Sequence, residues 1–418
     1  MRWKRRLTGF ALVVLATMMG TSPRLLRGAA AAQGSNTGEV PTYEPDPAFP
    51  RLPNNWVLGN VAGVVVDRHD NLWVIHRPHT VPAAKTPAPP VLEFDAAGKF
   101  LQAWGGDGPG FDWPDVEHNI FVDHKDNVWI SGSSPGGQSK TTRSDDMLLK
   151  FTNTGRFLLQ VGGRSVSLGS KDARSVNKPG DLFVSAKTNE VYVADGYGNR
   201  RVIVFDADTG AFKRMWGAFG KPPEDEPDSG GRGASGGPLG ARPGAAAARD
   251  GGRGAGPAVL DTEGPGPPDF ASPVHGIVVS NDNIVYVADR SNRRVQMFTP
   301  DGRYLGQIFV NRAGPEGSVS GFALSPDRDQ QFLYMADYGN SHIVVANRKK
   351  LEILYQFGKR GAAPGDFQGL HHIAVDSKGN LYTAEVAPGA RVQRFVFKGL
   401  SPGLPPNALT PAQLYAKQ

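Results

Sequence analysis

The chain of 418 residues contains no cysteine. This absence excludes disulfide bonds, thiolate metal ligands and a cysteine nucleophile. The fold must therefore be held by burial of a core, which this length permits. The net charge is only +6, and no long basic block with interleaved aromatic residues occurs, so we expect no nucleic-acid partner. Glycine and proline are abundant instead, with 53 and 34 residues, as is typical of a turn-rich β protein with low-complexity segments.

The chain also lacks an apolar run long enough to favour a membrane-spanning helix. The run at residues 7–20 follows a basic start and precedes the small-residue stretch GAAAAQ. This order predicts a secretory signal peptide over residues 1–32, and hence a secreted or periplasmic protein. The pair Arg5 and Arg6 also fits the twin-arginine export route. Arginines after the apolar run leave an uncleaved anchor as the alternative, the one case in which we expect contact with a membrane.

Six stretches share one plan, in which an apolar β-branched run, a polar turn and a second apolar run follow one another. They are residues 61–77, 117–133, 179–196, 274–290, 319–339 and 371–386. Asn, Asp and Gly at the turns are typical of β-hairpins. Two further strand-like runs follow most copies, as in residues 91–105 and 148–162. Four antiparallel strands repeated six times predict an all-β fold, a six-bladed β-propeller.

The propeller is expected over residues 54–399, with a Pro-rich segment at 33–53 before it and a tail at 400–418. The last copy lacks an outer strand. Residues 55–58 resemble the ends of other outer strands, so we predict that they close the ring and leave no exposed edge. Residues 221–268 are rich in Gly, Pro and Ala, which predicts a disordered inserted loop. The alternative for this insertion is a partner-binding tail.

The start of the first strand is an equivalent position in all six copies. The residues there are Ala62, His118, Gly180, His275, Ser320 and His371. Because the first strand of each blade lines the central channel, these positions form one ring, and three imidazoles at alternate places would converge on its axis. Such a set predicts a three-histidine metal site with an open position, for which zinc suits best. The alternative is that these are turn histidines of a degenerate repeat. His372 should point away from its neighbour and pack.

Three further candidates follow the second strand of their repeats: Arg77, Tyr197 and Arg290. If this end of the strands lies on the metal face, the two arginines would clamp a carboxylate and the tyrosine could act as a base. We therefore expect a small carboxylate-bearing or peptide substrate and a monomeric protein. The alternative is that such arginines form solvated ion pairs, which is the expectation for Arg200 and Arg201.

Local motifs around these residues resemble the NHL-repeat propellers, and among them the peptidyl-α-hydroxyglycine α-amidating lyases. The motifs are GNVAGVVVDRHDNLWVIHR, VYVADGYGNRR, SPVHGIVV and HHIAVDSKGNLY, and the similarity runs over most of residues 54–398. The resemblance implies cleavage of the C–N bond of an α-hydroxyglycine to give an amide and glyoxylate. It also implies roles for six residues: zinc ligands His118, His275 and His371, catalytic Tyr197, and functional Arg77 and Arg290.

The resemblance further implies a structural calcium ion, held by the carbonyl groups of Val64 and Ile120 and by an aspartate. His372 stands at the position of that aspartate, and a neutral imidazole is a poor ligand for a hard cation. Two other functional classes remain open. One is a non-catalytic propeller that binds a protein or glycan. The other is a calcium-dependent hydrolase such as a lactonase, although none of the six ring positions is acidic.

Overall fold

A computed structural model of the chain describes residues 38–135, 139, 141–225, 263–314 and 317–410. The chain divides into two units, Met1–Gly38 and Glu39–Gln418, and all that follows concerns the second. The predicted signal peptide lies outside the described residues. Within them, no helix has the length and apolar character needed to cross a membrane.

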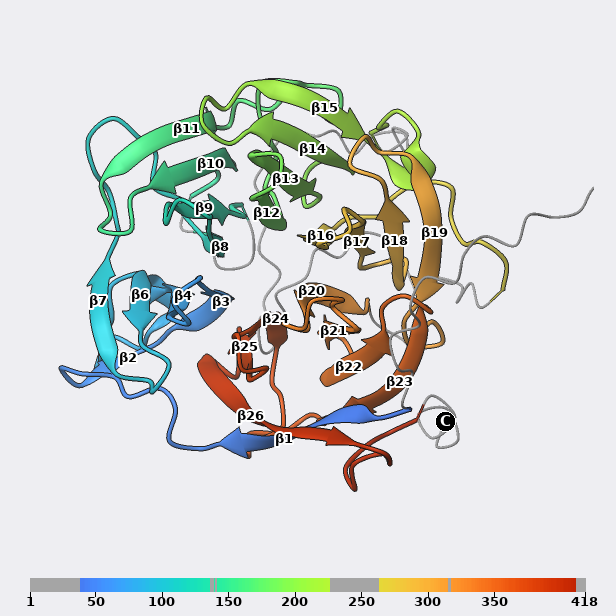
Figure 1. The fold of residues 1–418 in the computed structure, drawn as a ribbon. Coiled ribbons are helices and arrows are strands. Elements are labelled where there is room, and N and C mark those ends of the chain that lie inside the picture. The colour runs from blue at the N-terminus through green and yellow to red at the C-terminus, as the bar shows by residue number, and fades with distance from the viewer. Residues whose placement is uncertain (1–37, 136–138, 140, 226–262, 315–316, 411–418) are drawn as a thin grey trace, which may run out of the picture. The chain divides into compact units, whose positions relative to one another are not determined.

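Six four-stranded antiparallel sheets surround a central axis, so the predicted all-β six-bladed propeller is confirmed (Figure 1). Blades one to three consist of β3 (Asn60–Val66), β4 (Leu72–Arg77), β6 (Val91–Phe94) and β7 (Phe100–Trp104); β8 (Glu117–Val122), β9 (Val128–Gly132), β10 (Asp145–Phe151) and β11 (Phe157–Arg164); and β12 (Asp181–Ser185), β13 (Glu190–Asp195), β14 (Arg201–Asp206) and β15 (Phe212–Trp216). Blades four to six consist of β16 (Val274–Val279), β17 (Val285–Asp289), β18 (Arg294–Phe298) and β19 (Tyr304–Phe309); β20 (Val319–Leu324), β21 (Phe332–Asp337), β22 (His342–Asn347) and β23 (Glu352–Phe357); and β24 (Leu370–Val375), β25 (Leu381–Glu385), β26 (Arg391–Ser401) and β1 (Val40–Asp46).

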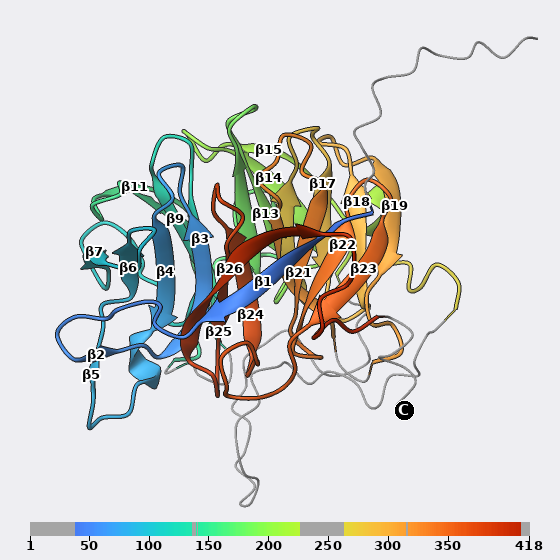
Figure 2. The ribbon, with the colours of Figure 1, turned by 60° about the horizontal axis from the view of Figure 1, so that its bottom comes forward.

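The ring is closed by β1, which pairs antiparallel with β26 from Val40 opposite Ser401 to Asp46 opposite Arg394. Figure 2 shows the two strands running together along the outer wall. The prediction that residues 55–58 close the ring is wrong: Trp56–Val57 form β2, which pairs with β5 (Thr86–Pro87) in a separate two-stranded parallel sheet. β1 was not predicted as a strand because it contains prolines. An edge strand nevertheless tolerates proline, because its outer N–H groups need no partner.

Apolar packing lies mainly between neighbouring blades. Val64 and Val74 of blade one, for example, share a buried cluster with Tyr382 and Ala384 of blade six. Each blade thus takes part in two such interfaces, one with each neighbouring blade. Loss of a blade would therefore expose apolar residues of its neighbours.

Only the two ends of the predicted disordered insertion are described, and both are held by hydrogen bonds. Ser170 N donates to Asp225 Oδ1 at 2.8 Å, and Arg312 donates to Gly264 O at 2.9 Å. Arg294 reaches Pro265 O at 3.2 Å. The prediction of disorder was therefore too wide at both ends, while residues 226–262 lie outside the described part of the chain.

Buried ion pairs fix the chain at the ends of two second strands. Arg201, with no exposed surface, donates to Asp195 Oδ2 at 2.8 Å and to Ser175 O at 2.7 Å. Arg294 makes the equivalent bond to Asp289 at 2.7 Å. The expectation that Arg201 forms a solvated pair is wrong. In each case the pair closes the base of the loop between the two residues, and removing one partner from such a pair leaves an uncompensated buried charge.

The closing strand gives a direct test of the fold. We expect a chain that begins at Ala48 to be less stable than one that begins at Glu39, because it loses β1. The loss includes the stacked contact of Tyr43 with Phe357, whose ring centroids lie 5.8 Å apart. The cost should be at least about 3–5 kcal/mol, the range for deleting one large buried aromatic side chain. Chemical denaturation of the two chains measures it; equal midpoints would contradict the assignment of β1.

A second test concerns His76, which is fully buried next to Arg77. Gly59 N donates to its Nδ1 at 3.1 Å, and burial lowers the pKa of His76 to about 4. The unfolded chain therefore takes up this proton at a higher pH than the folded chain, and stability is lost as pH falls from about 6.5 to about 4. Relative to His76→Gln, the wild type should lose about 3 kcal/mol over this window. Urea unfolding at several pH values measures the difference, and parallel curves would refute it.

Candidate metal centre

Three histidines from alternate blades meet at the axis. His118 lies on β8, His275 on β16 and His371 on β24, and each is at most 2% exposed. Their ring centroids are 4.8 to 5.2 Å apart, and their candidate ligand atoms all lie within 4.8 Å of one another. The structure thus brings together the three residues that the ring alignment selected.

A β-bulge turns each of these residues towards the axis. The strand register shifts between Glu117 and Asn119 on β8, and likewise across His275 on β16 and His371 on β24. Blades one and five have the same irregularity across Ala62 and Ser320. A bulge leaves one residue outside the ladder and re-aims its side chain. Five of the six ring positions therefore lie at such an irregularity, whereas β12 of blade three has none and begins after Gly180.

The Nδ1 atom of each of the three histidines is hydrogen-bonded to a backbone carbonyl of the next blade. The three bonds are His118 Nδ1 to Gly180 O at 2.9 Å, His275 Nδ1 to Ser320 O at 2.6 Å, and His371 Nδ1 to Ala62 O at 2.6 Å. A carbonyl oxygen only accepts, so each Nδ1 carries the proton and donates it. In the neutral ring Nε2 is then an unprotonated acceptor. Metal-binding histidines are oriented in this way.

Electrostatics favour the neutral form of His118 and His275. Burial lowers the pKa of His118 well below its ordinary value, and the nearby His371 and Arg77 lower it further. Burial acts in the same direction on the pKa of His275, with added contributions from His371 and Arg290. A neutral imidazole is the form that ligates a metal, so the site is prepared at physiological pH.

Tyr197 places its hydroxyl beside the cluster. Its Oη lies 3.2 Å from His118 Nε2 and 3.0 Å from His275 Nε2. The hydroxyl has one proton and can donate to only one of these two acceptors. A buried lone pair without a donor is costly, and a cation bound among the three imidazoles would satisfy it. The donor set, three neutral nitrogens with no thiolate, fits zinc with an open coordination position.

The loop that carries Tyr197 is fixed without a disulfide. The Asp195–Arg201 pair closes its base, and Asn199 Nδ2 donates to Asp195 Oδ2 at 2.7 Å. Gly198 N donates to Asn177 O at 3.0 Å, and a Cβ on Gly198 would lie 2.0 Å from Asn177 Oδ1. A larger residue there would have to displace the Asn177 side chain, and the backbone bond to Asn177 ties the loop that carries the tyrosine to the preceding segment.

The two predicted arginines flank the same cluster. Arg77 is 1% exposed, and its Nε donates at 2.8 Å to the carbonyl of Glu117, the residue before His118. Arg290 is half-buried, with its guanidinium 4.0 Å from the centre of the Tyr338 ring. That ring is 6.4 Å from the ring of His371. Positive charge therefore lies on two sides of the three histidines.

Sequence reasoning missed Tyr338. A signal was present, because Tyr338 follows Asp337 at the end of β21 just as Arg290 follows Asp289 at the end of β17. Equivalent exits of neighbouring blades face each other across one interface. The stacked cation and ring are the result, a contact that stabilises and orients a guanidinium.

Comparisons with known proteins agree with this architecture. No family model matches the chain. It is 25% identical to human NHL repeat-containing protein 3, over 92% of each chain. It is 24% identical over 65% of its length to a probable peptidyl-alpha-hydroxyglycine alpha-amidating lyase of Caenorhabditis elegans, and 24% identical over 86% to peptidyl-alpha-hydroxyglycine alpha-amidating lyase 1 of Drosophila melanogaster. The chain has NHL-repeat homologues. It spans 62% and 61% of the length of these two lyases.

Position 372, at which the resemblance implies a calcium-binding aspartate, carries a histidine in this propeller. His372 Nδ1 lies 3.0 Å from Val64 O, one of the two expected carbonyl ligands, and no carboxylate stands at position 372. His372 was expected to point away from His371 and pack, but its ring also makes a specific hydrogen bond to the neighbouring blade. The bulge between Leu370 and His372 removes the strict alternation on which that expectation rested, and the ring reaches the first strand of blade one.

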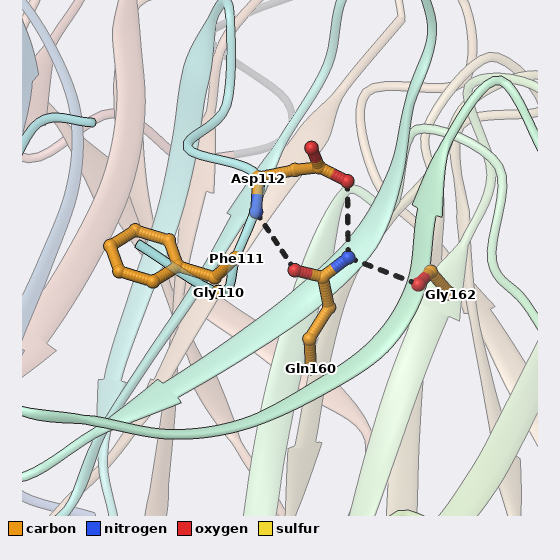
Figure 3. A pocket seen from close by; sticks show the side chains of 5 residues that line it. All are labelled: Gly110, Phe111, Asp112, Gln160 and Gly162. Atoms are coloured by element: carbon orange, nitrogen blue, oxygen red, sulfur yellow. Dashed lines mark hydrogen bonds between the residues drawn. The ribbon is translucent and has the colours of Figure 1, made fainter. Parts of the chain in front are cut away.

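A shallow pocket on blade two is distinct from the metal centre. It has a volume of about 400 Å³ and is lined by Gly110, Phe111, Asp112, Gln160 and Gly162 (Figure 3). The Gln160 amide accepts from Asp112 N at 2.9 Å and donates to Gly162 O at 3.2 Å. These polar groups bond to one another, and the pocket lies by the outer strand β11, so it adds nothing to the histidine site of the propeller.

The triad predicts the metal content of the purified protein. We expect about one divalent metal ion per chain in the wild type and a loss of at least tenfold in occupancy for His118→Ala, because two imidazoles hold a divalent ion far more weakly than three. His69→Ala is the control, since His69 is exposed on a turn of the same propeller. Elemental mass spectrometry measures the ratio. A folded wild type that takes up no metal when supplied with it would contradict the site.

Proposed function

We propose that the protein is an exported, zinc-dependent lyase that cleaves the C–N bond of an α-hydroxyglycine and releases an amide and glyoxylate. The observation that carries this proposal is the Tyr197 hydroxyl, which lies 3.0 and 3.2 Å from two of three converging histidine nitrogens. A fixed acid–base group beside a three-histidine site is what such a cleavage requires. The similarity to proteins named α-amidating lyases supports the same chemistry.

The arginines suit the carboxylate of such a substrate. An α-hydroxyglycine ends in a free carboxylate, and a guanidinium matches it with two parallel hydrogen bonds. Arg290 would bind it from the half-exposed side, where Tyr338 keeps the guanidinium oriented. Arg77 is buried and held by Glu117 O, so it would act mainly through its fixed positive charge.

The reaction moves one proton through Tyr197. Zinc held by His118, His275 and His371 would supply a Lewis acid for a substrate oxygen. In its deprotonated form, which a divalent cation beside it would favour, Tyr197 Oη takes the proton of the α-hydroxyl, the C–O bond becomes the aldehyde of glyoxylate, and the C–N bond breaks with its electron pair on nitrogen. Tyr197 then returns the proton to that nitrogen, which completes the amide and restores the site.

Burial of the cluster favours these steps. The three histidines are almost inaccessible to solvent, and charges in such an environment interact more strongly than in water. The fixed loop around Tyr197 removes the need to reorganise the base during the reaction.

Replacing the tyrosine separates chemistry from metal binding. We expect Tyr197→Phe to lower kcat by about 10²–10⁴-fold, the usual contribution of a general acid–base group, with the metal content unchanged. Tyr304→Phe, on outer strand β19, is the control and should match the wild type. Glyoxylate release from an N-acyl-α-hydroxyglycine is the assay. A turnover rate of Tyr197→Phe equal to that of the wild type would contradict the proposed mechanism.

Replacing Arg290 should act on substrate binding. Arg290→Met removes a charged hydrogen-bond donor, so we expect KM to rise about 10–100-fold with a smaller change in kcat. Tyr338→Phe keeps the stacked ring and should behave as the wild type, whereas Tyr338→Ala should raise KM in the direction of Arg290→Met. Steady-state kinetics on the same substrate decide between these outcomes, and an unchanged KM for Arg290→Met would remove Arg290 from the site.

A non-catalytic propeller that binds a protein or glycan is the second candidate. The match to NHL repeat-containing protein 3 covers 92% of both chains, and that name states the repeat without an activity. This second candidate is favoured if the purified wild type holds no metal and releases no glyoxylate.

A further inference from the structure

A second polar cluster lies on the channel-lining strands next to the metal centre. His372, 9% exposed on β24, places Nδ1 3.0 Å from Val64 O on β3 and Nε2 3.5 Å from Asp181 Oδ1 on β12. Asp181 accepts a hydrogen bond from Asn119 Nδ2 on β8, and its Oδ2 accepts from Ile277 N on β16 at 3.0 Å. These residues, which we call the channel bridge, come from five of the six blades.

The channel bridge has the wrong donors for calcium. This ion takes six to eight oxygen ligands. Here the carbonyl of Val64 accepts from Nδ1 of His372, and Asp181 is the single carboxylate of the cluster. The side chain at position 372 offers nitrogen where an oxygen ligand would be needed.

We propose that His372 takes the place of a structural calcium ion, because its imidazole occupies the carbonyl of Val64 that the ion would otherwise bind. Nδ1 donates to Val64 O, whereas Nε2 lies 3.5 Å from Asp181 Oδ1 without a hydrogen bond to it. The bond to Val64 O joins blades one and six without an ion. The bridge also anchors β24 at the residue next to His371, so it positions the third metal ligand independently of any calcium supply.

The test restores an oxygen ligand. His372→Asp adds a carboxylate beside Asp181 and leaves Val64 O without its imidazole partner. We expect this variant to retain about one calcium ion per chain after equilibration in millimolar calcium chloride, and its Tm to rise by several degrees on calcium addition. The wild type should retain no calcium and show no such rise. Elemental mass spectrometry and thermal unfolding of the full protein give the two readouts, and zinc content serves as the check that the histidine triad is intact.

Two variants complete the design. Asp181→Asn added to His372→Asp should abolish the calcium response, because it removes one of the two carboxylates. His372→Asn supplies a neutral oxygen and should bind calcium at least tenfold more weakly than His372→Asp. If His372→Asp does not fold, His372→Asn is compared with the wild type instead and should bind calcium more strongly. Stoichiometric calcium in the wild type that Asp181→Asn removes would overturn the proposal. So would folded, zinc-loaded His372→Asp and His372→Asn proteins that both ignore calcium.

Discussion

The candidate site depends on one repeated hydrogen bond, from the Nδ1 of a channel histidine to the carbonyl of the ring position in the next blade. It occurs three times, at 2.6 to 2.9 Å. Each bond fixes the tautomer of its imidazole, aims Nε2 at the axis and ties two blades together. The site and the closure of the ring are therefore one arrangement, because the partners that orient the metal ligands are the neighbours that complete the propeller.

The loops around this arrangement are held by charge rather than by covalent links. In a chain without cysteine, the pairs Asp195–Arg201 and Asp289–Arg294 close the loops that present Tyr197 and Arg290. Both arginines of these pairs are fully buried and bond to backbone carbonyls as well. Such pairs need good geometry to offset the cost of desolvation, and the propeller supplies it at corresponding places in successive blades.

Much of this could be predicted from the sequence, since both the blade count and the histidine ring follow from periodicity. The misses share a physical cause, which is that they depend on departures from regular strands. Prolines hid β1 because they are tolerated only on an edge, and the bulge at His371 interrupts the alternation from which simple packing of His372 was expected. Burial of Arg201 and the stacking of Tyr338 on Arg290 depend on how adjacent blades meet, which no single repeat encodes.

The pairing of β1 with β26 has a consequence for biosynthesis. The last blade takes its outer strand from the beginning of the folded region, and His371 takes its orienting carbonyl from Ala62 in the first blade. Both contacts cross the seam where the two ends of the ring meet. A growing chain can stack its early blades, but it cannot form the complete ligand set until its final blade has been synthesised. A metal ion held by all three histidines would therefore be bound only once the chain is complete, and a product truncated before blade six would lack His371.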